Sequence, residues 1–218
     1  MTATLSGPRR GAPGDGADRL VVFLHGYGAD GEDLIGIADM LAPHLPRTRF
    51  LAPNAPWRCR NNPMGYEWFP IPWMDGSTEA EMQAAFTASV SLLNGWLDGL
   101  PAAEGIGPER TVLVGFSQGT MMALHVGLRR DPGPAGIVGF SGRLLMPERL
   151  SEIVARPPVL LVHGDQDPLI PAASMAEAAE ALSAAGVPVK THLSRGVGHG
   201  IGPDGLGLAL GFIRERLP

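Results

Sequence analysis

A serine between two glycines is the residue in this chain best placed to do chemistry. Ser117 lies at the centre of GFSQG at 115–119, which fits the pattern G-x-S-x-G. The apolar run 111–114 before it predicts a buried strand, and apolar residues at helical spacing follow it. A strand, a sharp turn and a helix would expose the serine hydroxyl above unpaired helical N–H groups, which suit a developing oxyanion. The pattern also fits an ordinary Gly-Ser turn, so a catalytic Ser117 needs partners.

A serine hydroxyl becomes a useful nucleophile only beside a base. His199 is the best candidate, because it lies in the Gly-rich segment 196–200 after the last predicted strand, where small neighbours let an imidazole reach the rim of a sheet. The remaining histidines receive other interpretations: a strand surface for His192, helix or loop positions for His44 and His125, and structural hydrogen bonding in turns for His25 and His163.

The base needs an acid that fixes its tautomer, and two aspartates follow the predicted strand 159–162. We favour Asp167 over Asp165. Pro168 biases Asp167 towards an extended backbone that can direct its carboxylate along the rim, whereas Asp165 is expected to bond its own turn. The resulting order of serine, aspartate and histidine differs from both orders found in serine proteases.

An oxyanion formed at Ser117 would need two backbone N–H donors. One is predicted at Gln118, directly after the nucleophile, and the other at Tyr27, in the loop after an early strand. Only the backbone would act. An ordinary turn at 25–28 and a solvated Gln118 side chain are therefore both compatible with this role.

Elements that could hold these residues at one edge follow from the hydrophobic pattern. Apolar runs predict strands at 20–24, 49–51, 111–114, 136–140, 159–162 and 187–193. Apolar residues at helical spacing lie between these strands and predict helices. Thr78 and Glu81 can form a capping box at the start of one of them. Alternating strands and helices predict a mostly parallel sheet covered on both faces, with the active site beyond the carboxyl ends of the strands.

The segment 57–75 is predicted to be a long loop that folds over this edge. It holds three of the four tryptophans, and long loops in compact domains are often functional. An apolar pocket would suit an acyl chain or a hydrophobic alcohol, although core packing is as good an interpretation for each single residue. The candidate substrate-binding residues are Trp68, Phe69, Trp73, Met74, Leu144, Leu145, Ile170 and Ile201.

Composition narrows the class of protein. With 44% hydrophobic and 18% charged residues, the 218 residues are expected to form a single domain, with 1–18 as a loose lead-in. A net charge of −5 without a long basic run argues against nucleic acid. The single cysteine, Cys59, and the lack of paired ligand spacing predict no disulfide and no metal. The uncharged stretch 111–128 is interrupted by glycines and polar residues, so it does not predict a membrane helix. We therefore expect a cytoplasmic protein without membrane insertion. A homodimer is compatible with the sequence.

Seven short motifs give the chain a specific resemblance that runs from about residue 20 to 217. They are LHGYGADGEDL at 24–34, APNAP at 52–56, GYEWFPI at 65–71, GFSQG at 115–119, FSG at 140–142, HGDQDPLIP at 163–171 and GVGHGI at 196–201. The chain resembles the carboxylesterase/phospholipase family of α/β-hydrolases, which includes acyl-protein thioesterases and lysophospholipases.

The resemblance implies an α/β-hydrolase fold and cofactor-free hydrolysis of esters or thioesters. It also implies a triad of Ser117, Asp167 and His199 with oxyanion donors at Tyr27 and Gln118. Two departures lie close to the site, since Tyr27 stands where the family often has leucine and Thr120 where it usually has glycine.

Three functions therefore compete. The first is a serine carboxylesterase that acts on small to medium esters through an acyl-enzyme. An acyl thioesterase or lysophospholipase is the alternative with the same chemistry. A non-catalytic hydrolase fold that binds a small apolar ligand is the alternative of another class. A dienelactone-type hydrolase fits less well, because it would carry cysteine at position 117.

Overall fold

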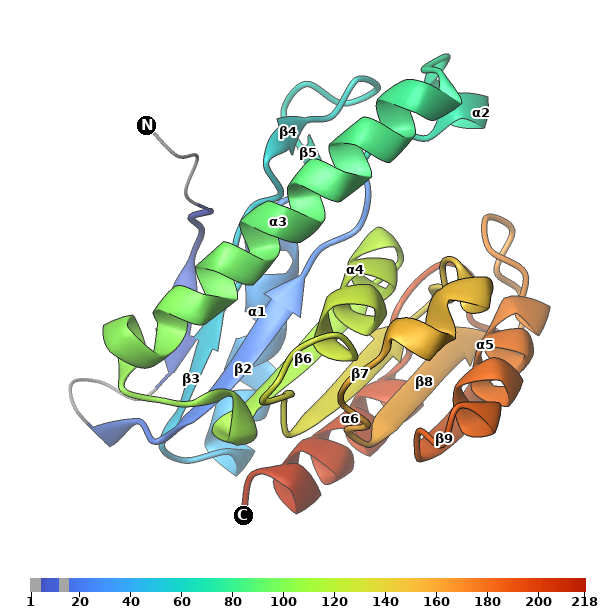
Figure 1. The fold of residues 1–218 in the computed structure, drawn as a ribbon. Helices are drawn as coiled ribbons and strands as arrows, with labels where there is room; N and C mark the ends of the chain where they lie inside the picture. Colours follow the sequence, from blue (N-terminus) through green and yellow to red (C-terminus); the bar gives the residue numbers. More distant parts are fainter. Residues whose placement is uncertain (1–4, 12–15) are drawn as a thin grey trace.

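A seven-stranded sheet forms the centre of the computed structural model, which describes residues 5–11 and 16–218 (Figure 1). The strand order is β1-β3-β2-β6-β7-β8-β9, and every neighbouring pair is parallel except β1 with β3. The strands are β1 (Arg9–Gly11), β2 (Arg19–Leu24), β3 (Thr48–Leu51), β6 (Thr111–Phe116), β7 (Gly136–Phe140), β8 (Val159–Gly164) and β9 (Val189–Ser194).

Helices cover both faces of this sheet, because the central strands are apolar on both sides. Successive β2 residues alternate between two cores, with Val22 in the core under one set of helices and Val21 in the core under the other. One face carries α3 (Glu79–Glu104), α4 (Gln118–Gly127) and α5 (Ala173–Ala184), and the opposite face carries α1 (Gly31–Leu41) and α6 (Pro203–Arg216). The mostly parallel sheet with helices on both faces confirms the predicted fold class.

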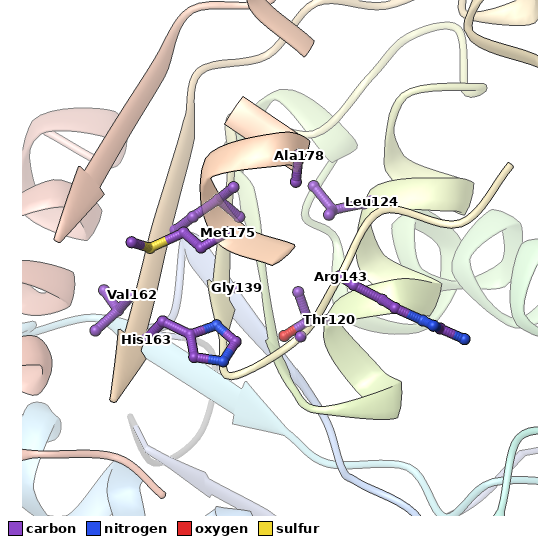
Figure 2. A pocket seen from close by; sticks show the side chains of 10 residues that line it. Thr120, Leu124, Gly139, Arg143, Val162, His163, Met175 and Ala178 are labelled. Atoms are coloured by element: carbon purple, nitrogen blue, oxygen red, sulfur yellow. The ribbon is translucent and has the colours of Figure 1, made fainter. Parts of the chain in front are cut away.

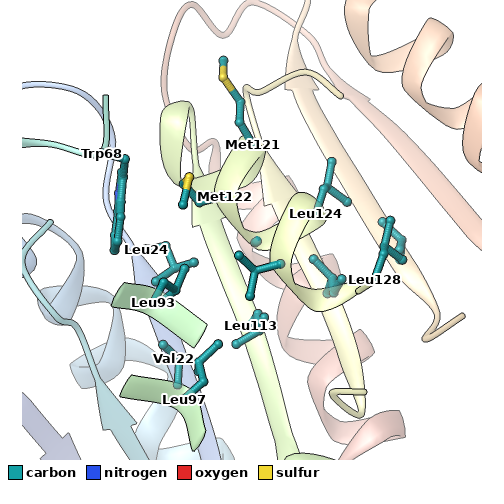
Figure 3. Packing of buried hydrophobic residues seen from close by; sticks show 14 of the residues in the cluster. Val22, Leu24, Trp68, Leu93, Leu97, Leu113, Met121, Met122, Leu124 and Leu128 are labelled. Atoms are coloured by element: carbon teal, nitrogen blue, oxygen red, sulfur yellow. The ribbon is translucent and has the colours of Figure 1, made fainter. Parts of the chain in front are cut away.

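The core beneath α3 and α4 joins the sheet to the segment that follows β3. Leu93 and Leu97 of α3 face Val22 and Leu24 of β2, and Trp68 lies at the top of the same cluster (Figure 3). The capping box predicted for α3 is confirmed, since Thr78 Oγ1 accepts from Glu81 N and the Glu81 carboxylate accepts from Thr78 N. This packing fixes the start of α3 next to the carboxyl edge of the sheet.

Two stretches expected to lack structure contain short elements. Within the predicted lead-in, residues 9–11 form the edge strand β1, while 1–4 and 12–15 lie outside the described residues. The predicted 57–75 loop contains the antiparallel pair β4 (Trp57–Arg58) and β5 (Tyr66–Glu67) and the one-turn helix α2 (Pro72–Asp75). Elements of two to four residues are too short to produce a periodic hydrophobic pattern, so the sequence gives no signal for them.

Helix α4 is buried along its whole length and carries His125 into the interior. Burial, followed by the nearby charges of Arg129 and Arg149, lowers the pKa of His125 from 6.5 to about 4. Between these two pH values the unfolded chain binds a proton at His125 and the folded chain does not. Stability therefore rises with pH across this interval, and acidification from 6.5 to about 4 removes part of it.

We expect His125→Gln to reduce the acid sensitivity of folding. The melting temperature of the variant should fall less than that of the wild type between pH 6.5 and about 4, because glutamine takes up no proton. His44→Gln is the matched control, since His44 is exposed at the end of the short 3-10 helix Ala42–His44. Equal slopes of melting temperature against pH in wild type and His125→Gln would contradict this account.

Candidate active site

Ser117 occupies a strained turn between β6 and α4. It is the N-cap of α4 with φ 53° and ψ −115°, a conformation that a side chain rarely adopts. The glycines on either side make the turn possible. A Cβ at Gly119 would collide with the carbonyl of Leu24, and one at Gly115 would collide with the backbone of Thr120. The pattern G-x-S-x-G thus reflects a close approach of three backbone segments.

Thr120 braces this turn from below. Its Oγ1 lies 2.8 Å from the carbonyl oxygens of both Gly115 and Phe140, at the ends of β6 and β7. Its methyl group takes space that glycines leave free, because a Cβ at Gly139 would lie 2.5 Å from Thr120 Cγ2 and one at Gly142 would also collide with this side chain. Threonine can therefore replace the glycine expected at position 120, because Gly139 and Gly142 leave room for its side chain.

Asp167 and His199 form a buried hydrogen-bonded pair. His199 Nδ1 lies 2.7 Å from Asp167 Oδ2, and the carboxylate is fully shielded from solvent. Burial alone would raise the pKa of Asp167, but hydrogen bonds from Ile170 N–H, His199 and Leu169 N–H outweigh it, so the pKa lies below its usual value. An ionised acceptor at Nδ1 leaves His199 Nε2 free to take a proton.

Asp165 has a different role from the one expected. Its Oδ1 accepts a 2.7 Å hydrogen bond from Gly196 N, in the loop that leads to His199, instead of bonding its own turn. It is Asp167 that bonds the backbone next to it, through Leu169 N and Ile170 N. The sequence could not distinguish the two, because the partner of Asp165 is 31 residues away.

A third side chain lies close to the acid. His163 is buried at the end of β8, where its Nε2 donates to the carbonyl of Ile170 at 2.8 Å and lies 3.2 Å from Asp167 Oδ2. This is structural hydrogen bonding within a turn, as expected for His163, and it helps to fix the carboxylate that faces His199.

The loop 25–28 lies directly against Ser117. A Cβ at Gly26 would come within 3.3 Å of Ser117 Cβ. The buried His25 holds the loop, since its Nδ1 donates to Gly26 O and its Nε2 accepts from Ala55 N. Burial lowers the pKa of His25, which agrees with an uncharged ring that both donates and accepts.

Gln118 is buried and its side chain ties the elbow to the 57–75 segment. Its Oε1 accepts from Trp68 N at 2.8 Å and its Nε2 donates to Phe69 O at 2.7 Å. A solvated side chain at Gln118 is therefore wrong. In the part of the chain that the structure describes, the backbone N–H groups of Gln118 and Tyr27 donate no hydrogen bond. They remain free to act on a ligand.

His199 lies next to the turn that carries Ser117. The His199 ring lies 5.1 Å from the ring of Phe116, the residue before the serine. Among the described side chains, no hydrogen bond joins Ser117 Oγ to His199. Such contacts are often loose in a ligand-free site and tighten when substrate binds.

Comparison with known proteins agrees with this geometry. The family model described as Phospholipase/Carboxylesterase matches residues 11–217. The chain belongs to this family. It is 30% identical to the acyl-protein thioesterase 1 of Gibberella zeae, over 91% of this chain and 90% of the relative. It is also 30% identical to the esterase YpfH of Escherichia coli K12, over 95% of this chain and 87% of the relative.

Two solved structures are similar to this chain over nearly its whole length. The crystal structure of esterase PE8 is 44% identical with a TM-score of 0.88 and covers 99% of this chain and 100% of PE8. Arabidopsis thaliana SOBER1 is 25% identical with a TM-score of 0.77, over 92% of this chain and 99% of that structure. The predicted family and fold are confirmed, and the chain is a hydrolase of the esterase and acyl-protein thioesterase type.

The predicted substrate-binding side chains differ in how far they are exposed to solvent. Trp68 is fully buried, donates from Nε1 to His25 O and stacks at a tilt against the His25 ring, so in this structure it offers no surface to substrate. Phe69 is also buried, edge-on to Phe86. Trp73 is 73% exposed and Met74 39% exposed. The remaining candidates are half-buried near the strand ends: Leu144, Leu145, Ile170 and Ile201.

A narrow cavity lies beneath the elbow, between α4, β7, β8 and α5 (Figure 2). Its lining includes Thr120, Gly139, His163 and Met175. No part of it would hold a water molecule, so it is a packing gap and not a substrate site.

Within residues 5–11 and 16–218, nowhere do three or more His, Cys, Asp or Glu side chains gather in a way that could hold a metal ion. Nor do these residues include a helix that is both long and apolar enough to cross a membrane.

Proposed function

We propose that this hydrolase is a serine carboxylesterase that cleaves small to medium carboxylic esters through an acyl-enzyme. The observation that carries the proposal is the hydrogen-bonded Asp167–His199 pair, whose imidazole lies against Phe116, the neighbour of the strained Ser117. Two free backbone N–H groups, at Tyr27 and Gln118, complete the arrangement. A nucleophile, a base, an acid that orients the base and an oxyanion site are the parts that acyl transfer requires.

The first half-reaction forms the acyl-enzyme. Ser117 Oγ attacks the ester carbonyl while His199 Nε2 takes the hydroxyl proton. The oxyanion is held by the N–H groups of Tyr27 and Gln118, and the ionised Asp167 stabilises the imidazolium. The C–O bond to the alcohol then breaks, and His199 gives its proton to the departing oxygen.

In the second half-reaction, water replaces the serine. His199 takes a proton from the water as it attacks the acyl carbonyl. The bond to Ser117 Oγ breaks, the proton returns to the serine and the acid leaves. No step needs an electron carrier or a metal.

Thioester hydrolysis is the second candidate, because several relatives carry the name acyl-protein thioesterase. The same site would act on a thioester, with a thiol as the leaving group. The exposed Trp73 and Met74 give an apolar surface near the rim for either acyl chain. Ester and thioester activity therefore differ in this proposal by the group that leaves, not by the residues that act.

A substrate screen tests the proposal. We expect the protein to hydrolyse 4-nitrophenyl esters of short and medium acids, with a burst of 4-nitrophenol when acyl-enzyme breakdown is slow. Matched acyl thioesters and lysophospholipids complete the panel. Faster thioester turnover at equal acyl length would favour the second candidate. A folded protein that turns over none of these substrates would instead be a ligand-binding hydrolase fold.

A further inference from the structure

The side chain of Tyr27 joins the oxyanion loop to a distant turn. Its hydroxyl donates a 2.9 Å hydrogen bond to Asp75 Oδ2, across 48 residues of sequence. Asp75 is the last residue of α2, which lies near the start of α3 at the carboxyl edge of the sheet (Figure 1). The loop that would bind the oxyanion is thus physically connected to a segment above it.

Asp75 is built to hold this connection. Its Oδ2 also accepts from Ile71 N at 2.7 Å and its Oδ1 from Ser77 N at 2.9 Å. Burial opposes the charge, but these hydrogen bonds and the one from Tyr27 keep the pKa of Asp75 below its usual value. The carboxylate both closes its own turn and accepts from the oxyanion loop.

The Tyr27 hydroxyl is the donor in the bond to Asp75. Burial and the neighbouring Cys59 and Asp75 raise its pKa, so the phenol keeps its proton. Glu67, close by and buried, adds a further acidic neighbour, and burial raises its pKa in turn. A leucine at position 27 would supply no donor to Asp75.

The turn that Tyr27 holds carries two exposed apolar side chains, Trp73 and Met74, which we call the apolar lip. Besides the Tyr27 hydrogen bond, a bond of 3.1 Å from Asn61 Nδ2 to Met74 O ties the lip to the rest of the protein. Gly26, next to Tyr27, lies against Ser117. The residue that anchors the lip is therefore the direct sequence neighbour of the residue that contacts the proposed nucleophile.

We propose that the Tyr27 hydroxyl is a positioning residue that sets the substrate size preference of this hydrolase. It holds the apolar lip at a fixed place beside the oxyanion loop, where Trp73 and Met74 contact the larger acyl or alcohol groups of the substrate. This inference rests on the proposed esterase function. It explains why large apolar side chains stay exposed on a short turn that is tied by hydrogen bonds and not by core packing.

The test compares two esters and two tyrosines. Tyr27→Phe removes the hydroxyl and keeps the backbone N–H. We expect KM for 4-nitrophenyl octanoate to rise about five- to tenfold, because a hydrogen bond to a charged acceptor is lost, and KM for 4-nitrophenyl acetate to rise less, so that the preference for octanoate over acetate falls. Tyr66→Phe is the matched control. Tyr66 is the only other tyrosine, and its hydroxyl makes no hydrogen bond to another described residue.

Trp73→Ala tests the lip itself, and as an exposed side chain Trp73 can be removed without loss of core. We expect the preference for octanoate over acetate to fall as much as in Tyr27→Phe. The Tyr27→Phe/Trp73→Ala double variant should show no further fall, because both changes remove the same contact between the lip and the substrate. If Tyr27→Phe proves unstable, Tyr27→Leu replaces it.

Three results would overturn the proposal: equal losses on both esters in the Tyr27 variant, an unchanged preference in Trp73→Ala, or additive effects in the double variant. Wild-type protein that hydrolyses neither ester would refute the esterase function itself, which is a different outcome.

Discussion

Replacing Ser117 with alanine is expected to abolish ester hydrolysis and fluorophosphonate labelling together. In the proposed mechanism the hydroxyl forms the covalent bond to the acyl group, so turnover should fall on the order of 10⁵–10⁶-fold. Intact mass of the wild type should show one adduct, and peptide analysis should place it on a peptide that contains 115–119. Alanine keeps the Cβ of serine, and the Ser117 side chain makes no capping hydrogen bond to α4, so the variant is expected to stay folded.

Ser141 provides the control for this experiment. It also follows a strand, has a positive φ of 47° and is buried, but its Oγ donates to Gly200 O. The Ser141→Ala variant should still be labelled by the fluorophosphonate at Ser117. Its free energy of unfolding should fall by about 1 kcal/mol, because the hydrogen bond to Gly200 O is lost. Labelling that persists in Ser117→Ala, or that disappears in Ser141→Ala with folding intact, would exclude Ser117 as the nucleophile.

The second large effect is expected at Asp167. Asp167→Asn should lower turnover on the order of 10³–10⁴-fold, because an amide cannot hold His199 in the required tautomer or stabilise its positive form. The hydrogen bonds from Leu169 N and Ile170 N can still be accepted by the amide oxygen, so the fold should survive. Turnover of a simple ester, with melting temperature as the folding control, measures both.

Asp165→Asn is the matched substitution two residues away. Its amide oxygen can still accept from Gly196 N, so we expect most activity to remain. The pH dependence of turnover should likewise resemble the wild type. An inactive Asp165→Asn enzyme beside an active Asp167→Asn enzyme would show that the acid was assigned two residues too late.

The sequence predicted the parts of the site that depend on repeating patterns. Buried strands appear as apolar runs, and the alternation of strands and helices places Ser117, Asp167 and His199 at one edge before any coordinate is known. The G-x-S-x-G spacing also has a local cause, since both glycines face backbone.

What the sequence could not show are pairings between segments far apart in the chain. Nothing in the composition of 57–75 indicates that Gln118 would bond the backbone of Trp68 and Phe69, or that Trp68 would be buried against His25. The Tyr27–Asp75 bond is of the same kind. A hydrogen bond between two loops leaves no periodic signal, and only the folded arrangement of the sheet brings its partners together.

Thr120 has a consequence for how this site can change over generations. Because its methyl group fills the space opposite Gly139 and Gly142, an alanine at either glycine is excluded as long as threonine is present. A lineage would first have to acquire glycine at 120, losing the hydroxyl that joins β6 to β7, before position 139 opened to a larger residue. Position 142 would stay closed even then, because a Cβ there would also meet the backbone oxygen of Ser117. Positions 120 and 139 are therefore epistatic, and the order of their substitutions, rather than their individual costs, decides which sequences this site can reach.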